Sequence, residues 1–93
     1  MLSEIPVKLE NVEKKVLDRE ILRLAMIAEL DAISLYEQLA AATNDENIKK
    51  VLLDVAKEEK THVGEFQALL LKEDKQQVEE LEKGEEEVKE IIE

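Results

Sequence analysis

Apolar residues recur at alternating steps of three and four along two long stretches of the chain, which is the spacing of an amphipathic α-helix. The first stripe consists of Leu22, Ala25, Glu29, Ala32, Tyr36 and Leu39. The second stripe consists of Ile48, Leu52, Val55, Glu59, His62, Phe66 and Leu69. Each stripe is apolar towards its ends and polar in its middle. The pattern therefore predicts two helices whose apolar sides are interrupted by polar residues at matching heights.

Capping signals set the expected ends of these two helices. Asp18 is a suitable N-cap, so we expect the first helix to span residues 18–42. Thr43 and Glu46 have the spacing of a capping box, in which Thr43 accepts from the Glu46 amide while the Glu46 carboxylate reaches back. We therefore expect a short connection and a second helix over residues 45–72, antiparallel to the first.

The two ends of the chain have a different character. Asp74 with Gln77 repeats the capping signal, which predicts a short acidic helix over residues 74–93. Gly84 lies within this segment and is expected to interrupt or end the helix. Residues 1–17 contain the single proline and no sustained periodicity, so we expect an extended arm.

Composition agrees with one small helical domain that covers residues 1–93. The chain has two glycines and one proline, and it is rich in the residues that favour helices. Charged residues make up 40% and hydrophobic residues 44%, a balance that suits folded amphipathic helices better than a disordered acidic chain. The predicted fold class is all-α: a two-helix hairpin followed by a short C-terminal helix.

Charge and cysteine content exclude several classes of function. The formal net charge of −11 would repel nucleic acid, and no stripe of lysine and arginine offsets it. The chain has no cysteine, which excludes disulfides and thiolate metal sites. It has no secretory signal and no apolar run long enough to cross a membrane, so the expected location is cytoplasmic.

The polar residues in the middle of the stripes suggest a metal site. An ionised carboxylate that is buried without a partner costs several kcal/mol. A metal cation would offset the charge of Glu29 and Glu59. Glu59 and His62 stand at positions i and i+3, so both side chains can reach one ion. Glu-x-x-His is the helical unit of di-iron carboxylate bundles, and its ligands suit iron or manganese.

The number of ligands indicates that two chains share the site. A complete site of this kind needs two Glu-x-x-His units and two further glutamates. The chain has one histidine and hence one such unit, Glu59 to His62, together with one glutamate, Glu29, on the other long helix. A two-fold homodimer would supply the missing half and would also complete a four-helix bundle from two hairpins.

Each of these residues also has a structural reading without metal. A single histidine on a helical stripe is most often structural, and Glu29 could pair with a lysine. Tyr36 could be a core residue whose hydroxyl is hydrogen-bonded. The alternative is therefore a metal-free helical oligomerisation module, in which buried polar groups fix the register of the helices. The alignment of Glu29, Tyr36, Glu59 and His62 at one height favours the metal site.

The same residues resemble the encapsulated ferritin family, the half-length ferritin-like proteins found inside encapsulin nanocompartments. The resemblance covers residues 20–71, and it is strongest in the runs ILRLAMIAELDA (21–32), LYEQ (35–38) and EEKTHVGEF (58–66). The chain is particularly similar to the form that some archaea join to the shell protein.

This resemblance implies an enzyme, a ferroxidase that oxidises Fe(II) to Fe(III) for storage as mineral at a di-iron site between two subunits. It implies that Glu29, Glu59 and His62 are metal ligands and that Tyr36 lies beside the site. It further implies dimers that assemble into an annular decamer. A secondary metal position on the path into the site has two acidic residues in the family. Asp31 matches one of them, and Ala28 stands at the other.

The resemblance also implies an encapsulin shell protein as partner and a location inside the nanocompartment. Family members that are separate from the shell carry a C-terminal targeting peptide, whereas this sequence stops in the acidic stretch 85–93. Either the chain is cut from a shell fusion or it is packaged in another way. Rubrerythrin-like peroxide reduction at the same site is a second candidate activity. It is weakened because rubrerythrins pair such a site with cysteine-bound iron.

Overall fold

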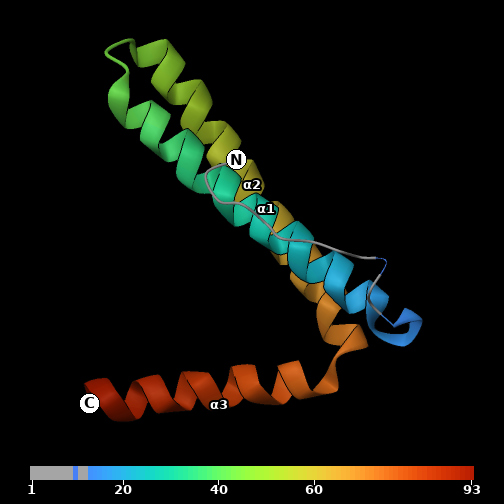
Figure 1. Cartoon of the computed structure of the whole chain (residues 1–93). Helices are drawn as coiled ribbons and strands as arrows, with labels where there is room; N and C mark the ends of the chain where they lie inside the picture. The colour runs from blue at the N-terminus through green and yellow to red at the C-terminus, as the bar shows by residue number, and fades with distance from the viewer. Residues whose placement is uncertain (1–9, 11–12) are drawn as a thin grey trace.

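The computed structural model describes residue 10 and residues 13–93, and this part of the chain contains helices and no strand. Its elements are α1 (Lys14–Ala42), α2 (Glu46–Glu73) and α3 (Lys75–Ile92). The helices α1 and α2 form a long antiparallel hairpin, and α3 leaves the end of α2 in a different direction (Figure 1). The predicted all-α class and the three helices are confirmed. Within the described ranges no helix is long and apolar enough to span a membrane.

The first helix begins earlier than its capping signal predicts. Its N-cap is Glu13, which makes no side-chain capping hydrogen bond, and Asp18 is an exposed residue inside the helix. The prediction that the helix starts at Asp18 was therefore wrong. No glycine or proline lies between residues 13 and 18, so nothing in this segment stops the helix from extending towards the N-terminus. The predicted arm falls largely on residues 1–9, 11 and 12, which are outside the described part of the chain.

The hairpin connection is capped by Asp45 and not by the predicted pair of Thr43 and Glu46. The Asp45 carboxylate accepts from the backbone N–H of Asn47 at 2.8 Å and of Ile48 at 3.0 Å. The Asp45 N–H donates to the Thr43 hydroxyl at 3.1 Å. An ionised carboxylate accepts more strongly than a hydroxyl does, so Asp45 takes the N-cap position and α2 starts at Glu46.

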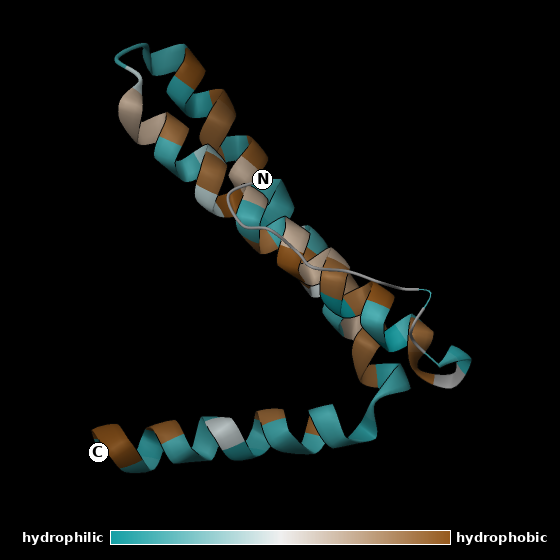
Figure 2. Ribbon diagram, viewed as in Figure 1, coloured by the Kyte–Doolittle hydropathy of each residue, from teal (hydrophilic) through white to brown (hydrophobic). Residues whose placement is uncertain are grey.

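The core of the hairpin is a narrow line between α1 and α2. The most buried apolar side chains are Ile33 and Ala40 on α1 and Ala56 and Leu70 on α2. Alanine at the contact allows the two helix backbones to approach closely. Many larger apolar side chains on the hairpin remain about half exposed. In Figure 2, brown segments alternate with teal ones along both helices of the hairpin. So little buried apolar surface is a weak basis for a stable monomer of this size.

A bend separates α2 from α3, and contacts from α1 hold it. Asp74 is the N-cap of α3, where its Oδ1 accepts from the Gln77 N–H at 3.1 Å, as the sequence predicted. Its Oδ2 is paired with the Arg23 guanidinium on α1 at 3.0 Å. Arg19 Nε, one turn earlier on α1, donates to the Glu73 carbonyl at 3.0 Å. These contacts join residues that are far apart in the sequence and fix where α2 ends.

The third helix continues through Gly84, so the predicted interruption there was wrong. Gly84 has no positive φ, and it lies between strong helix formers whose backbone hydrogen bonds continue on both sides. No residue of α3 is buried. Its surface is mostly polar, with apolar residues towards its C-terminal end (Figure 2). Of these, Val88, Ile91 and Ile92 are 54%, 81% and 76% exposed.

The pKa of Asp74 predicts how the bend responds to acid. The Gln77 backbone hydrogen bond and then the hydrogen bond from Arg23 lower this pKa below its ordinary value, against the opposing effect of burial. Because the folded-state pKa lies below the unfolded-state value of about 3.9, the stabilisation is complete above that value. It is lost as pH falls through the folded-state pKa.

We therefore expect the free energy of unfolding of wild type to exceed that of Asp74→Asn by a constant amount from pH 7 to about 5. Below about pH 4 the difference should shrink, because protonated Asp74 and asparagine are both neutral. Urea denaturation followed by circular dichroism at each pH measures the difference. The asparagine variant is the appropriate control because it keeps an oxygen that can cap α3. A difference that already shrinks between pH 7 and 5 would contradict the assignment.

Candidate metal centre

Glu29, Glu59 and His62 meet halfway along the hairpin. Glu29 comes from α1, and Glu59 and His62 come from successive turns of α2. The Nδ1 atom of His62 lies 3.4 Å from Oε2 of Glu29 and 3.4 Å from Oε2 of Glu59. The antiparallel pairing set by the short connection between the helices brings α1 and α2 into this register. The imidazole therefore faces both carboxylates from one edge.

The spacing of the three side chains fits a bound cation. One ligand atom from each residue lies within 4.8 Å of the others. Ligands bonded to one metal ion at about 2.0–2.2 Å are at most about 4.4 Å apart, so small side-chain movements bring all three onto one ion. The donor set of two carboxylates and one imidazole suits iron or manganese.

The burial of the carboxylates gives an independent reason for a cation here. Glu29 and Glu59 are each 19% exposed in their side chains, and His62 is 42% exposed. The buried Oε2 atom of Glu29 has no hydrogen-bond partner. Its distance to His62 Nδ1 is longer than the 2.7–3.2 Å usual for an N–H···O hydrogen bond. A buried acceptor without a partner is destabilising by about 1–3 kcal/mol, and more when it is charged. A metal ion would supply the missing partner.

The three candidate ligands lie on one side of the hairpin, next to the buried line and not within it. Successive residues of a helix are separated by about 100° around its axis. On α2, Glu59 and His62 therefore both lie to the same side of the buried Ala56. Apolar residues of the two predicted stripes share this side, and those towards its ends are about half exposed: Leu39 at 45%, Ile48 at 52% and Leu69 at 51%. We call these three residues and the three ligands the ligand face. It combines the candidate metal ligands with incompletely buried apolar surface.

Tyr36 and Asp31 stand outside the three-residue cluster. Tyr36 is half-buried on α1, two turns beyond Glu29 and roughly 10 Å further along the helix axis. It is on the same side of α1 as Glu29, but it does not lie against the cluster at the same height. Asp31 is buried and lies about 200° around the helix from Glu29. The structure therefore brings Glu29, Glu59 and His62 together and does not bring Asp31 to them.

Sequence reasoning missed the contacts made by Arg19 and Arg23. They are the only arginines in the chain and stand one helical turn apart, which places their side chains on one face of α1. That spacing was a signal that both act on one target. Their target could not be read from the sequence, because Glu73 and Asp74 are more than 50 residues away.

A helical hairpin that carries an inward glutamate and a Glu-x-x-His unit has the components of a ferritin-like carboxylate metal protein. Comparison with known proteins specifies the class further. The sequence model of the EncFtn-like family matches residues 4–85. The chain belongs to this family.

A protein and a crystal structure from Pyrococcus furiosus are similar to this chain. A ferritin-like–encapsulin shell fusion protein is 69% identical over 72 residues, which are 77% of this chain. This chain spans about a fifth of that protein's length (21%). The crystal structure of the encapsulated ferritin domain is 57% identical and matches with a TM-score of 0.85, over 99% of this chain and 96% of that chain. These comparisons confirm the resemblance to encapsulated ferritins and the ferritin-like helical fold.

Substitution of the three ligands should separate metal binding from folding. We expect Glu59→Ala, His62→Ala and Glu29→Ala each to lower the affinity for Fe(II) by at least about tenfold, since each removes a ligand. Helix content should stay nearly unchanged, because none of the three side chains belongs to the buried core of the hairpin. Anaerobic Fe(II) titration by calorimetry and far-ultraviolet circular dichroism measure the two quantities.

Two variants serve as controls for this experiment. Glu58→Ala removes an exposed carboxylate about 100° around α2 from Glu59 and should leave the affinity unchanged. Tyr36→Phe should retain metal binding. If Glu58→Ala weakens Fe(II) binding as much as Glu59→Ala does, the assignment of the ligands is wrong.

Proposed function

We propose that the chain is one half of a ferroxidase, in which two copies bind a pair of Fe(II) ions as substrate and oxidise them to Fe(III). The observation that carries this proposal is the cluster of Glu29, Glu59 and His62, with one ligand atom from each within 4.8 Å of the others. Each chain thus offers one set of ligands, enough for one ion of the pair.

The shared site follows from what a single chain lacks. A complete di-iron site of the helical type uses two Glu-x-x-His units and two more glutamates. The single His62 allows one such unit per chain. Two ligand faces related by a two-fold axis would bring both units together and would cover the half-exposed Leu39, Ile48 and Leu69. Metal binding and burial of apolar surface therefore favour the same homodimer.

The proposed reaction is balanced by one two-electron acceptor. Each Fe(II) ion loses one electron on becoming Fe(III), so the pair delivers two electrons. These electrons and two protons reduce O2 to hydrogen peroxide, or reduce hydrogen peroxide to two molecules of water. The carboxylates of Glu29 and Glu59 favour the product, because their negative charge stabilises Fe(III) more than Fe(II). Tyr36, which is two turns beyond Glu29 on the same side of α1, would lie at one end of the site.

Iron storage inside an encapsulin nanocompartment is the proposed setting. It is supported by the similarity to a P. furiosus protein in which a ferritin-like part is fused to an encapsulin shell. The proposed partners are other copies of the chain and an encapsulin shell protein. The side of the hairpin opposite the ligand face also exposes apolar residues, Ile27, Leu30 and Leu53. A second apolar side would allow dimers to join into the annular decamer that the family resemblance implies.

Assembly should depend on metal. In the metal-free dimer, Glu29 and Glu59 would face the same carboxylates of the second chain, and like charges at short distance repel. We expect Fe(II), added anaerobically, to shift the population from monomer to dimer and larger species. Native mass spectrometry measures both the mass of the assembly and the number of ions bound.

Glu29→Ala is the informative variant in this assay. It should bind less iron, yet associate more readily than wild type without metal, because one repulsive pair is removed. A wild-type chain that stays monomeric at saturating Fe(II) would rule out the shared site. A chain that forms the same assemblies with and without metal would favour the metal-free oligomerisation module.

The activity itself is tested by stopped-flow measurement of Fe(III) formation with O2 or hydrogen peroxide as oxidant. We expect wild type and Glu58→Ala to oxidise Fe(II) at similar rates, and His62→Ala to fall to the rate of iron in buffer. Protein that binds Fe(II) in pairs but does not accelerate its oxidation by either oxidant would retain the site and exclude a ferroxidase.

A further inference from the structure

The bend between α2 and α3 lies in a sequence that favours an unbroken helix. Neither glycine nor proline occurs between residues 65 and 83. The residues on both sides of Asp74 are Leu, Lys, Glu and Gln, which are among the best helix formers. Asp74 is the only residue of the junction that disfavours a helix interior, and it does so mildly. Local sequence therefore offers a cap at Asp74 for a new helix, but it contains no glycine or proline that forces α2 to end there.

The backbone hydrogen bonds that a continuous helix would make across the junction are missing in the bent chain, and one of them has been replaced on both sides. In an unbroken α-helix, the N–H of Gln77 would donate to the carbonyl of Glu73, four residues earlier. In the structure the Gln77 N–H donates to Asp74 Oδ1 at 3.1 Å. The Glu73 carbonyl accepts from Arg19 Nε at 3.0 Å. The Gln77 N–H and the Glu73 carbonyl therefore each have a different hydrogen-bond partner in the bent chain. The partner of the carbonyl, Arg19, belongs to α1.

A second arginine of α1 holds the carboxylate in its capping position. Arg23 contacts Oδ2 of Asp74 at 3.0 Å and is itself paired with Glu20 at 2.9 Å. Only 10% of the Asp74 side chain is exposed, whereas 41% of the Arg23 side chain is, so the pair lies at the edge of the buried region. Oδ1 of Asp74 is thereby turned to α3 and Oδ2 to α1. We call Arg19, Arg23 and Asp74 the elbow latch.

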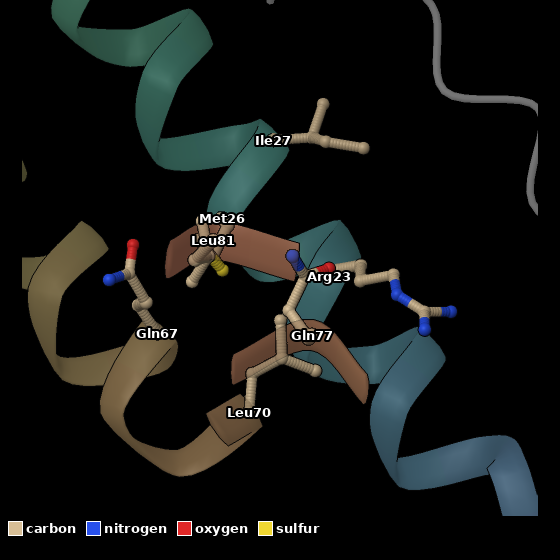
Figure 3. A pocket seen from close by; sticks show the side chains of 7 residues that line it. All are labelled: Arg23, Met26, Ile27, Gln67, Leu70, Gln77 and Leu81. Atoms are coloured by element: carbon tan, nitrogen blue, oxygen red, sulfur yellow. The ribbon is translucent and has the colours of Figure 1, made fainter. Parts of the chain in front are cut away.

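The space inside the bend, between α3 and the hairpin, is an open groove and not a packed core. A groove of about 310 Å³ lies there between α3 and the hairpin, and Met26, Ile27, Leu70 and Leu81 contribute its apolar lining (Figure 3). No residue of α3 is buried. Straightening the chain would therefore uncover little apolar surface of α3 itself, and on the hairpin it would uncover mainly Leu70. The latch contacts are the polar contacts that straightening would break.

We propose that residues 46–92 form a two-state helix, which is bent at Asp74 while the elbow latch is closed and becomes one continuous helix when the latch is removed. The latch is a conformational device separate from the metal centre, and it sets the direction of α3. Release exchanges the Arg19–Glu73 and Asp74–Gln77 hydrogen bonds and the Arg23–Asp74 ion pair for the helical hydrogen bonds that would cross the junction, among them the one between Gln77 and Glu73.

The latch is closed at neutral pH. The charged groups that face Asp74 are Arg19 and Arg23 of α1, and Glu20 shares Arg23 with it. Both arginines favour the ionised form of Asp74, in agreement with the lowered pKa of this carboxyl. Wild-type protein at pH 7 should therefore be bent.

Distance measurements between spin labels on α2 and α3 test the proposal directly. The chain has no cysteine, so Lys57→Cys and Glu87→Cys at two exposed positions give one labelled pair. A continuous helix would place these residues about 45 Å apart at 1.5 Å per residue, and the bent chain holds them closer. Pulsed electron–electron double resonance gives the distribution of distances between the two labels. Labelled protein is diluted into unlabelled protein so that pairs of labels on different chains do not contribute.

Wild type should show one distance population, well below 45 Å. Arg19→Ala with Asp74→Ala should raise the fraction near 45 Å at least tenfold, and helix content by circular dichroism should not fall. Arg19→Ala alone should raise the same fraction to a smaller extent. Lys72→Gln is the matched control, since it removes an exposed positive charge from the last turn of α2 without touching the latch, and it should resemble wild type.

An unchanged distribution in the double variant would overturn the proposal. A broad distribution without a component near 45 Å would also overturn it, because that result describes a flexible hinge and not a second helix. Arg19→Ala leaves the capping carboxylate and the buried apolar side chains in place, so it decides the question even if the double variant does not fold. None of these variants alters Glu29, Glu59 or His62, so Fe(II) binding by the same samples reports separately on the proposed function.

Discussion

The structure depends on two partly buried carboxylates that face one histidine on an otherwise apolar side of a helical hairpin. Glu29 and Glu59 each keep less than a fifth of their side-chain surface exposed, and one oxygen of Glu29 has no hydrogen-bond partner. Desolvated negative charges of this kind are strongly unfavourable unless a cation or hydrogen-bond donors compensate them. A metal ion would supply that compensation, and carboxylate and imidazole groups are suitable ligands for iron or manganese.

The same constraint links the candidate metal site to the small core of the hairpin. A hairpin buries one line of side chains between its two helices, and here that line includes small residues such as Ala40 and Ala56. The remaining apolar surface is left for contacts between chains. In the proposed dimer, the surface that completes the core of a four-helix bundle is also the surface that completes the metal site. Folding, association and iron binding are then linked, since each brings the same two ligand faces together.

Much of the metal centre could be predicted from the sequence, because helical periodicity fixes which residues share a face. Glu59 and His62 fall one turn apart on any regular helix, and the short connection near Asp45 determines that Glu29 pairs with them. The start of α1 was missed because helix formers extend it beyond the capping signal at Asp18. The contacts at the bend could not be predicted, since Arg19 and Arg23 act on residues distant in sequence.

A crystal structure of the iron-loaded protein, with anomalous data collected above and below the iron absorption edge, tests the shared site most directly. Our account predicts two iron positions roughly 3.5–4 Å apart, on either side of a two-fold axis. Glu59 and His62 of each chain should bind one ion, and Glu29 of both chains should approach the pair. Iron bound within one chain with no second copy opposite, or His62 directed into solvent away from any iron, would contradict it.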